Sequence, residues 1–578
     1  MDTHTSAPEP LPAVADVAVI GGGAAGLTLA LQLRKARPHT TIVVVEREEH
    51  PVPETTHKVG ESTVEIAGYY LREVLGLDEH LRAEQLDKFG LRVFFSHAGN
   101  EDITRRVELG HSVRPPGAVG TYQIDRGRLE NALGRELAAQ GVLFHSGTRT
   151  EEVELDPTTD HHRLRLRTAD GTLHHLRARW VVDATGRSSM VKRRLGLAKR
   201  VGHRANAVWF RVGHPIDVDQ WSDDPAWHAR IEEGERELST NHLMGPGYWV
   251  WLIRLASGSI SIGIVTDAQT HSFDEMNRFD RAMEWLARHE PQCAREIGAH
   301  RDKLQDFRVM KDYAYSCERV FSSDRWCLAG EAGVFLDPLY SPGLDLIAVG
   351  NGLITDLISR ALDGEQVEEL AAIHNQVFLL IAEGWLSIYE HQYQLMGNSR
   401  VMITKVIWDT AVYWAVPGLL FFHDKLRELG ELPTVIADLA RFSSIGTITQ
   451  RFLREWAAAE REPRHQAPFV RFYDFEFMRR LHIGMTADLD GVAFQEQFAT
   501  NVRFIEQLSG QLVSTVLAEF DAEPWDETKR AQAEKWRSDR HLSELVEVYR
   551  QEADTVPVSD RWIRLWSADE SISTGEAR

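Results

Sequence analysis

A glycine-rich turn that interrupts an apolar, β-branched stretch constrains this chain most. Residues 17–26 read Val-Ala-Val-Ile-Gly-Gly-Gly-Ala-Ala-Gly, and a helical pattern begins at Leu27. Gly21, Gly23 and Gly26 take the three fixed places of G-x-G-x-x-G. The first glycine allows a tight bend, the second lets the backbone approach a pyrophosphate, and the third lets the helix pack on the strand. The phosphates would then lie at the N-terminus of the helix, so the stretch predicts a dinucleotide-binding βαβ unit.

The residues after this turn support the same interpretation. A second apolar run, residues 41–45, ends at Glu46, which lies 20 residues past Gly26. A carboxylate at that place can accept hydrogen bonds from ribose hydroxyls. An ordinary βαβ unit with a glycine-rich turn remains the alternative, but the order of strand, helix and acid favours a nucleotide site.

Composition narrows the class of protein. A chain of 578 residues predicts two to four domains, and 43% hydrophobic with 26% charged residues is typical of a soluble globular protein. The formal net charge of −21 disfavours nucleic acid or an anionic membrane as a partner. Cys293, Cys317 and Cys327 lack C-x-x-C spacing and the 25 histidines are scattered, so the sequence predicts no metal site, no disulfide framework and a cytoplasmic location.

The pattern of apolar residues divides the chain into four regions of an α/β protein. Residues 1–13 read as a disordered tail, and residues 14–200 with 306–365 as a discontinuous nucleotide-binding domain. Residues 201–305 predict an antiparallel sheet that covers a substrate cavity, and residues 366–578 predict helices. The most apolar long stretch, residues 401–422, is interrupted by charged residues and a proline, which favours a buried or substrate-lining helix over a membrane span.

Two distant motifs complete the first one. Asp183-Ala-Thr-Gly-Arg-Ser follows a buried strand, and Ala329-Gly-Glu-Ala-Gly-Val-Phe-Leu-Asp-Pro follows another. Together with the glycine turn they resemble the flavoprotein group that contains aromatic hydroxylases, geranylgeranyl-type reductases and flavin-dependent halogenases, over about residues 14–365. The resemblance implies noncovalent FAD in a Rossmann-like domain of the glutathione-reductase or p-hydroxybenzoate-hydroxylase type, with an inserted antiparallel sheet and a mainly helical C-terminal region.

The resemblance also implies which residues hold FAD. One of them, Glu331, stands where the group usually has aspartate. The implied cofactor-binding residues are Gly21, Gly23, Ala24, Ala25, Gly26, Glu46, Arg47, Gly60, Ser62, Thr63, Arg126, Asp183, Gly186, Glu331, Asp337, Gly343 and Leu344.

Within the group, the finer resemblance is to the halogenases, including tryptophan halogenases. Val59-Gly-Glu-Ser-Thr resembles their motif beside the flavin ring, Lys88 lies in the region of their catalytic lysine, and residues 249–254 resemble W-x-W-x-I-P. Asp337-Pro-Leu-Tyr-Ser-Pro-Gly resembles their halide-binding loop. The implied roles are catalysis for Lys88 and Glu61, halide binding for Ser341, Pro342 and Gly343, and a wall between flavin and substrate for Trp249 and Trp251. Two residues depart from the pattern: Arg254 replaces the proline, and Pro342 has no N–H.

The resemblance therefore implies a two-component halogenase. A separate reductase would supply FADH2, which with oxygen and halide yields hypohalous acid, and Lys88 would direct the halogen to an electron-rich aromatic or heteroaromatic substrate, free or carrier-bound. The absence of a second G-x-G-x-x-G for a nicotinamide cofactor fits that dependence.

Other interpretations stay open from the residues alone. Arg254 and Pro342 favour a halide-independent flavin monooxygenase or dehydrogenase, and a flavin-binding protein without turnover is a third possibility. The alternative for Lys88 is a solvated lysine. Lys58 competes with Lys88 for the catalytic role, and its own alternative is contact with FAD or solvent. The two tryptophans have the alternative of core packing, and Glu61 that of capping a turn.

Overall fold

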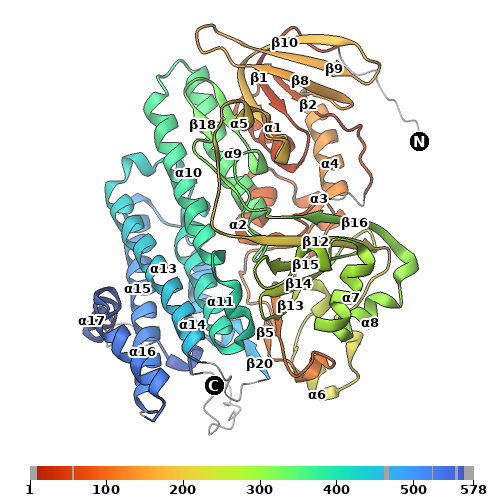
Figure 1. The fold of residues 1–578 in the computed structure, drawn as a ribbon. Helices are drawn as coiled ribbons and strands as arrows, with labels where there is room; N and C mark the ends of the chain where they lie inside the picture. The colour runs from red at the N-terminus through yellow and green to blue at the C-terminus, as the bar shows by residue number, and fades with distance from the viewer. Residues whose placement is uncertain (1–9, 55–57, 461–467, 524, 553–557, 565–578) are drawn as a thin grey trace.

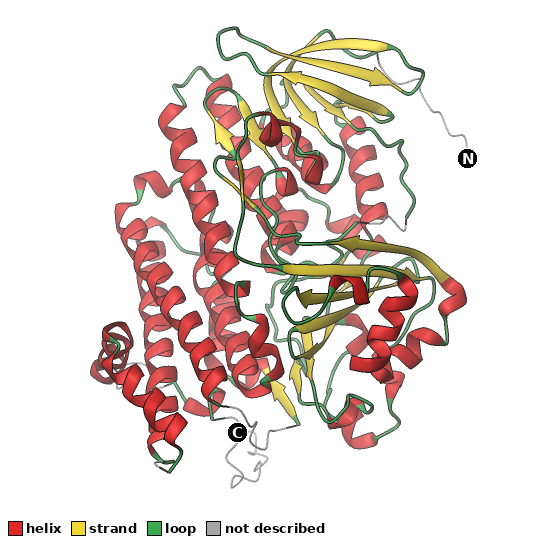
Figure 2. Cartoon of the chain, in the orientation of Figure 1, coloured by secondary structure: helices red, strands yellow, loops and turns green. Residues whose placement is uncertain are grey.

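The computed structural model describes residues 10–54, 58–460, 468–523, 525–552 and 558–564. Most of the predicted tail, residues 1–9, lies outside the described residues. Figure 1 shows two β-sheets along one side of the molecule and long helices along the other, and Figure 2 shows the same division by secondary structure.

The first sheet is the parallel sheet that the N-terminal motif predicts. Its parallel strands run in the order β19-β10-β1-β2-β7. Their bounds are β1 Val14–Ile20, β2 Ile42–Val45, β7 Leu143–His145, β10 Leu173–Asp183 and β19 Trp326–Leu328. β8 (Thr148–Glu154), β9 (His162–Thr168) and β18 (Phe321–Ser322) add antiparallel partners. Because the carboxyl ends of parallel strands meet at one edge, the segments after β1, β2, β10 and β19 gather there.

Helices α1, α4 and α9 pack beside this sheet, with α1 between the other two. Their bounds are α1 Ala24–Ala36, α4 Arg126–Ala139 and α9 Gly343–Leu362. The short helix α2 (Glu65–Tyr69) continues into a π-helical turn, Tyr70–Val74. The N-termini of α1, α2 and α9 lie at or just after the glycine turn, residues 59–63 and the predicted halide loop, so those motifs occupy connections that lead into helices.

The second sheet is larger than the region 201–305 in which the sequence predicts it. Its order is β16-β12-β15-β14-β13-β4-β5-β20, with β13–β4 and β20–β5 parallel. The bounds are β4 Leu91–Phe95, β5 Glu108–Gly110, β12 Ala205–Val212, β13 Thr240–Gly245, β14 Tyr248–Arg254, β15 Ile260–Asp267, β16 Leu304–Met310 and β20 Phe469–Arg471. Strands from the N-terminal part and from the helical region thus join the inserted strands. A local sequence pattern does not predict this, because the paired strands are far apart in the sequence.

Alternation along the strands gives this sheet two distinct faces. Val208 and Val250 point into one buried cluster, which includes side chains of α7 (Phe279–His289) and α8 (Pro291–Gly298). Trp209, Trp249 and Trp251 point into the other cluster, which continues into the first sheet. The second face therefore turns toward the cofactor-binding half of the molecule.

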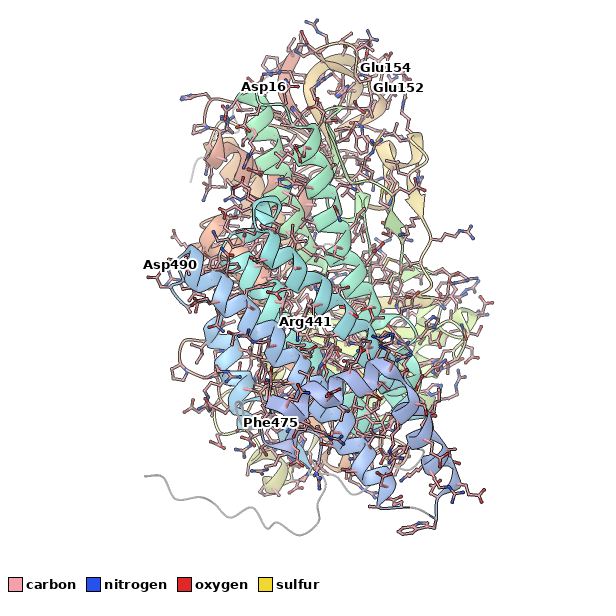
Figure 3. The ribbon with its side chains drawn as sticks, turned by 90° about the vertical axis from the view of Figure 1, so that its left-hand side faces the viewer. Asp16, Glu152, Glu154, Arg441, Phe475 and Asp490 are labelled. Carbon is pink, nitrogen blue, oxygen red and sulfur yellow. The ribbon has the colours of Figure 1, made fainter. Side chains whose placement is uncertain are left out.

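The C-terminal region is helical, as the sequence predicts. Its long helices are α10 Glu368–Tyr389, α11 Ser399–Tyr413, α13 Pro433–Ala459 and α15 Gly491–Asp521. An Arg441–Glu506 ion pair joins α13 to α15, and Figure 3 shows Arg441 in the middle of this helical layer, with Asp490 at the start of α15. The shorter helices are α12 Leu419–Phe422, α14 Glu476–Gly484, α16 Glu527–Ser538 and α17 Arg540–Glu552.

The apolar stretch at residues 401–422 forms α11, a π-helical turn at Trp414–Gly418 that contains Pro417, and α12. Most of its residues are buried within the protein. Within the described part of the chain, no helix has the length and apolar character that crossing a membrane requires.

Candidate active site

A cavity of about 1030 Å³ lies at the carboxyl edge of the first sheet. The turns after β1, β2 and β10 line it together with residues near Glu331. Gly21 has φ +112°, and a Cβ there would lie 2.3 Å from the Ala184 carbonyl oxygen. Only glycine fits at this crossing of two turns. Ala24, Ala25, Arg47 and Gly186, which belong to the predicted cofactor-binding set, also line the cavity.

Glu46 fixes the geometry of the glycine turn as well as lining the cavity. One carboxylate oxygen accepts a hydrogen bond from the Gly22 N–H at 2.5 Å, and the other accepts one from the Glu48 N–H at 2.9 Å. Gly22 must be glycine, because a Cβ there would lie 2.7 Å from the Glu46 side chain. The acid therefore holds two backbone segments in place at the cavity wall.

Basic side chains lie near Gly23, the second glycine of the motif, whose backbone is exposed to the cavity. A Cβ added to Gly23 would lie 3.8 Å from Lys58 Nζ, and Lys58 pairs with the buried Glu130 at 2.5 Å. Arg126 donates to Glu130 at 2.8 Å and to the Val59 carbonyl at 2.6 Å. Its buried Nε has no hydrogen-bond partner among the described residues. An open backbone, a helix N-terminus and two cations suit a pyrophosphate.

A second cavity, of about 90 Å³, continues from the first. Val59, Arg126, Glu331 and Ile347 line both cavities. Burial raises the pKa of Glu331 above its ordinary value. One cavity for a dinucleotide end and a second beyond a shared junction fit FAD, and Glu331, which lines both, would hold the cofactor at that junction.

The second cavity, here called the ring-side cavity, collects most of the residues predicted to act near the flavin ring. Its other lining residues include Gly60, Glu61, Ser62, Trp249, Trp251, Asp337, Ser341, Pro342, Gly343 and Leu344. Glu61 is 3% exposed and pairs with Arg211 at 2.7 Å. Burial raises the pKa of Glu61 although Arg211 opposes the shift. A buried carboxylate of this kind stays a candidate for proton transfer.

Lys88 lies between β3 (Leu86–Asp87) and β4, three residues before the start of β4. It is only 1% exposed, which excludes the solvated alternative. Its Nζ donates to Ser62 Oγ and to the Thr63 carbonyl oxygen, both at 2.8 Å. Ser62 Oγ lies 2.8 Å from Thr240 Oγ1, and Ser62 and Thr240 line the ring-side cavity. Burial lowers the pKa of Lys88 to about 7, although nearby Glu65 and Asp345 oppose the shift.

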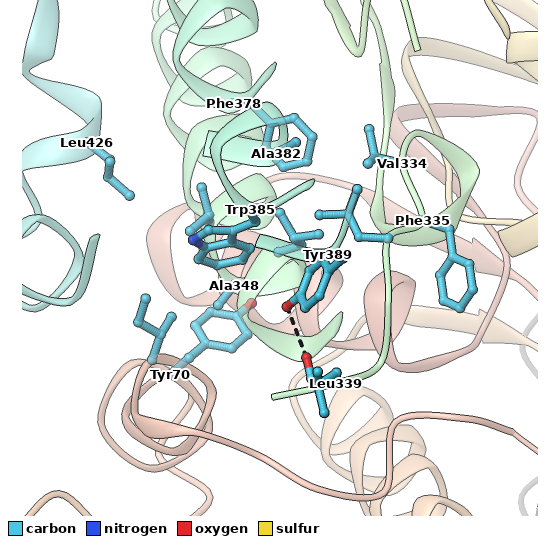
Figure 4. Close-up of a cluster of buried hydrophobic side chains, with 14 of the residues drawn as sticks. Tyr70, Val334, Phe335, Leu339, Ala348, Phe378, Ala382, Trp385, Tyr389 and Leu426 are labelled. Carbon is cyan, nitrogen blue, oxygen red and sulfur yellow. Dashed lines mark hydrogen bonds between the residues drawn. The ribbon is translucent and has the colours of Figure 1, made fainter. Parts of the chain in front are cut away.

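Lys88 also lines a third cavity, of about 880 Å³, here called the substrate cavity. Side chains of α10, α11 and α13 form most of its wall. Figure 4 shows Trp385 and Tyr389 of α10 near the loop of Leu339, whose carbonyl accepts a hydrogen bond from Tyr389 Oη at 2.9 Å, with Leu426 on a separate segment. Lys88 thus links the two cavities through Ser62.

Three predicted cofactor-binding residues lie behind the cavity walls instead of lining them. Gly26 allows α1 to pack on the turn, since a Cβ there would lie 2.0 Å from the Gly21 carbonyl oxygen. Asp183 accepts hydrogen bonds from Thr185 N and Oγ1 and from Val191 N, so it shapes its own turn. Thr63 Oγ1 accepts a hydrogen bond from the Tyr122 N–H at 2.7 Å. All three therefore shape the backbone of the cavity wall, and their direct contact with the cofactor stays a prediction.

Asp337 lines the ring-side cavity, but its oxygens bind protein groups. One oxygen accepts from Tyr313 Oη and Tyr393 Oη at 2.7 and 2.6 Å, and the same oxygen lies 2.6 Å from His203 Nε2. The other accepts from the Leu339 N–H. These donors lower the pKa of Asp337 despite its burial. The aspartate holds the start of the predicted halide loop against the helical region.

The two tryptophans predicted to form a wall lie between the core and the ring-side cavity. Trp249 Nε1 donates to Tyr393 Oη at 2.8 Å and Trp251 Nε1 to Ser261 Oγ at 3.2 Å, and both rings belong to the core. They line the ring-side cavity and not the substrate cavity. Pro342 lines both cavities, so the described boundary between them is formed by the halide loop and by Ser62 and Lys88.

The structure brings in residues that sequence patterns did not single out. Asp345 on α9 lines the substrate cavity, accepts hydrogen bonds from the Ala67 N–H and Tyr413 Oη, and burial raises its pKa to about 8. Asp409 binds Lys405 at 2.8 Å and accepts from Tyr340 Oη at 3.2 Å. For Asp409 the signal in the sequence was a pair of charges inside the apolar stretch 401–422, whereas no pattern marked Asp345.

Comparisons with known proteins agree with an FAD-binding fold. A family model described as an FAD binding domain matches residues 14–343. The flavin-dependent halogenase chlA of Dictyostelium discoideum is 25% identical over 438 residues, covering 69% of this chain and 70% of the relative. The 1H-pyrrole-2-carbonyl peptidyl-carrier-protein chlorinase of Pseudomonas fluorescens is 26% identical, covering 73% of this chain and 93% of the relative.

One group of solved structures shares the fold over nearly the whole chain. The structure of halogenase PltM in complex with phloroglucinol and FAD has a TM-score of 0.62 at 16% identity and covers 95% of this chain and 98% of that one. The comparisons confirm the predicted α/β fold class, the FAD cofactor and the resemblance to flavin-dependent halogenases. They do not favour the halide-independent alternative.

Proposed function

This chain belongs to the FAD-binding domain family, and from that membership we propose that it is a flavin-dependent halogenase in which Lys88 passes an oxidised halogen to an electron-rich aromatic ring. The halogenases among its relatives support the reaction type. The observation that carries the proposal is the place of Lys88, which is buried between the ring-side cavity and the substrate cavity.

The halide loop is the part of the site that departs from the resemblance. Tyr340 and Ser341 have φ +68° and +60°, and α9 begins two residues later at Gly343. Pro342 cannot donate from its backbone. The backbone N–H groups of Gly343 and Leu344, at the positive end of a 20-residue helix, remain as donors for a halide.

Bound FAD, once reduced, supplies the oxygen chemistry that converts halide to hypohalous acid. Lys88 then provides the amine. Its two hydrogen bonds, to Ser62 Oγ and the Thr63 carbonyl, match the two N–H groups of a neutral amine and leave its lone pair free. A pKa near 7 keeps part of the lysine neutral at physiological pH.

The proposed transfer balances in two steps. The Lys88 amine attacks the halogen of hypohalous acid, an N–X bond forms, and the O–X bond breaks with release of water. The ring carbon of the substrate then takes the halogen and loses its proton, which restores the amine. The substrate is an electron-rich aromatic or heteroaromatic compound, because such a ring donates the electron pair.

The test replaces the amine and keeps the volume. Purified Lys88→Met, supplied with FAD, a flavin reductase, NADH and bromide, should halogenate a resorcinol at least about 10³-fold more slowly than the parent, as expected when a nucleophile is removed. Its FAD affinity should stay unchanged. Lys35→Met, at an exposed lysine outside the cavities, is the matched control and should keep full activity. Full activity in Lys88→Met, or oxygenated product without halide, would contradict the proposal.

The pH dependence separates the two roles of the amine. If the neutral amine reacts, the halogenation rate rises with pH through about 7. A rate that falls through the same pH would mean that the ammonium acts instead as a hydrogen-bond donor to hypohalous acid.

The proposal includes a separate flavin reductase, because the sequence carries a single G-x-G-x-x-G turn. Activity with NADH alone would contradict this part. The three cysteines are buried and free, which supports the proposed cytoplasmic location.

A further inference from the structure

The substrate cavity is much larger than the chemistry at Lys88 requires. Its volume of about 880 Å³ lies near the upper end of the range of about 300–1,000 Å³ that is typical of sites for drug-sized ligands. The halogenation chemistry needs only one ring beside the lysine. The remaining space therefore has to accommodate another part of the substrate.

The cavity runs from a buried polar end to an exposed apolar end. Lys88 and Asp345 are 1% and 0% exposed, whereas Leu380 on α10 and Ile436 on α13 are 41% and 47% exposed. Exposed large aliphatic side chains at a cavity mouth favour contact with an apolar ligand. The mouth thus lies between α10 and α13.

The wall between these two ends is mostly aliphatic and aromatic. It includes Val377, Ile381, Trp385 and Ile388 of α10 and Leu439 and Phe442 of α13. Residues i, i+4, i+8 and i+11 of α10 lie along one helical stripe, so the apolar surface follows the helix axis for about three turns. Such a stripe suits an extended, flexible hydrocarbon chain.

The charges at the mouth indicate how the substrate is presented. Among the described residues that line the cavity, Lys88 is the only lysine and there is no arginine. The exposed Glu383 pairs with Lys199 at 2.9 Å. A carrier-bound substrate would arrive on a phosphopantetheine arm, whose phosphate favours cations at the entrance. The described cavity wall offers that phosphate no cation at the mouth, and the lysine beside the mouth, Lys199, is already paired with Glu383.

We infer that the substrate is a free, electron-rich aromatic compound with a long apolar substituent, whose ring lies at Lys88 and whose chain follows α10 toward Leu380 and Ile436. The ring assignment rests on the proposed halogenase function. The binding of the apolar chain depends only on the cavity.

The experiment measures binding and turnover separately on the FAD-loaded protein. The probes are 4-alkylresorcinols with chains from methyl to hexyl. Each added methylene should lower Kd by up to about fourfold, which corresponds to about 0.8 kcal/mol per buried CH2. The heat-capacity change of binding should also become more negative as the alkyl chain lengthens.

Variants at the mouth test the direction of the chain. The double variant Leu380→Ser/Ile436→Ser should reduce the gain in affinity for the longest chains. Val492→Ser, at a valine that is 68% exposed on α15 and outside the cavity, is the matched control and should leave the whole series unchanged. Because all three positions are exposed, these substitutions leave the core intact.

The outcomes distinguish the inference from the function. A Kd that does not depend on chain length, or halogenation only of a carrier-bound thioester, would overturn the inference and leave the halogenase proposal standing. A Kd that falls with chain length, without halogenation of any probe, would support the inferred ligand class and overturn the proposed function. Chain-length-dependent binding together with halogenation supports both.

Discussion

The cofactor cavity and the substrate cavity are walled by different parts of the polypeptide. At the cofactor cavity, backbone atoms of glycine turns form much of the wall, and Gly21 and Gly26 leave no room for a Cβ. At the substrate cavity, side chains of three helices form the wall, and glycines such as Gly446 have open space around them. A backbone wall tolerates few residue types, whereas a side-chain wall of apolar groups tolerates many.

The strongest test of this contrast places the same substitution in both walls. Gly21→Ala should abolish FAD binding, because the residue has φ +112° and its new methyl group would lie 2.3 Å from a carbonyl oxygen. Flavin absorbance after reconstitution measures the loss. Gly446→Ala, inside α13, should bind FAD normally and raise the free energy of unfolding by about 1 kcal/mol. Equal effects of the two changes would break the contrast.

The next effect concerns the buried carboxyl group of Asp345 at the substrate cavity. Burial raises the pKa of Asp345 from an ordinary 3.8 to about 8, so between these pH values the folded chain holds a proton that the unfolded chain has lost. The free energy of unfolding therefore falls as pH rises through this window. Asp345→Asn should remove that fall, and its stability relative to the parent should rise from pH 4 to pH 8 by at most about 5 kcal/mol, at 1.36 kcal/mol per pKa unit.

Denaturant unfolding at a series of pH values gives this difference. The exposed Asp488→Asn, measured over the same pH series, serves as the control for loss of a surface carboxylate. If Asp345→Asn gave a constant difference, the carboxyl group would be ionised in the folded protein at all these pH values.

The smallest expected effect compares two lysines. Lys58 lies beside the backbone of Gly23 at the cofactor cavity, whereas Lys88 lies at the substrate cavity. Lys58→Met should raise the Kd for FAD about tenfold, which corresponds to about 1.4 kcal/mol for one partly exposed charge on a phosphate. At saturating FAD, the halogenation rate should stay within about twofold of the parent. A slow enzyme with normal FAD affinity would instead place Lys58 in the chemistry.

The predictability of the site follows the same division. The cofactor end was readable because each motif, such as residues 21–26, joins one strand to the next helix within a short stretch. The place of Lys88 was also readable, through its position in a motif. The pairing of Glu61 with Arg211, 150 residues later, was not, because β12 reaches the motif only through the second sheet.

The tryptophan pair shows the limit of a motif-based role. Their alternation in β14 correctly places both on one face, but only the packed structure decides which cavity that face meets. The three residues behind the wall, Gly26, Thr63 and Asp183, show the same limit. Each belongs to a cofactor motif, yet each acts on the neighbouring backbone.

The sequence by itself determined the βαβ unit, the FAD-binding motifs, the helical character of the C-terminal region and the candidate lysine. These depend on local backbone conformation and on apolar periodicity, both of which short segments carry. The tertiary structure alone decided that Lys88 joins two cavities, that Asp345 is a buried acid near it, and that α10 and α13 shape a long apolar cavity. Such features depend on contacts between segments far apart in sequence, and those contacts also set the desolvation that moves the pKa values of Lys88 and Asp345 toward neutrality.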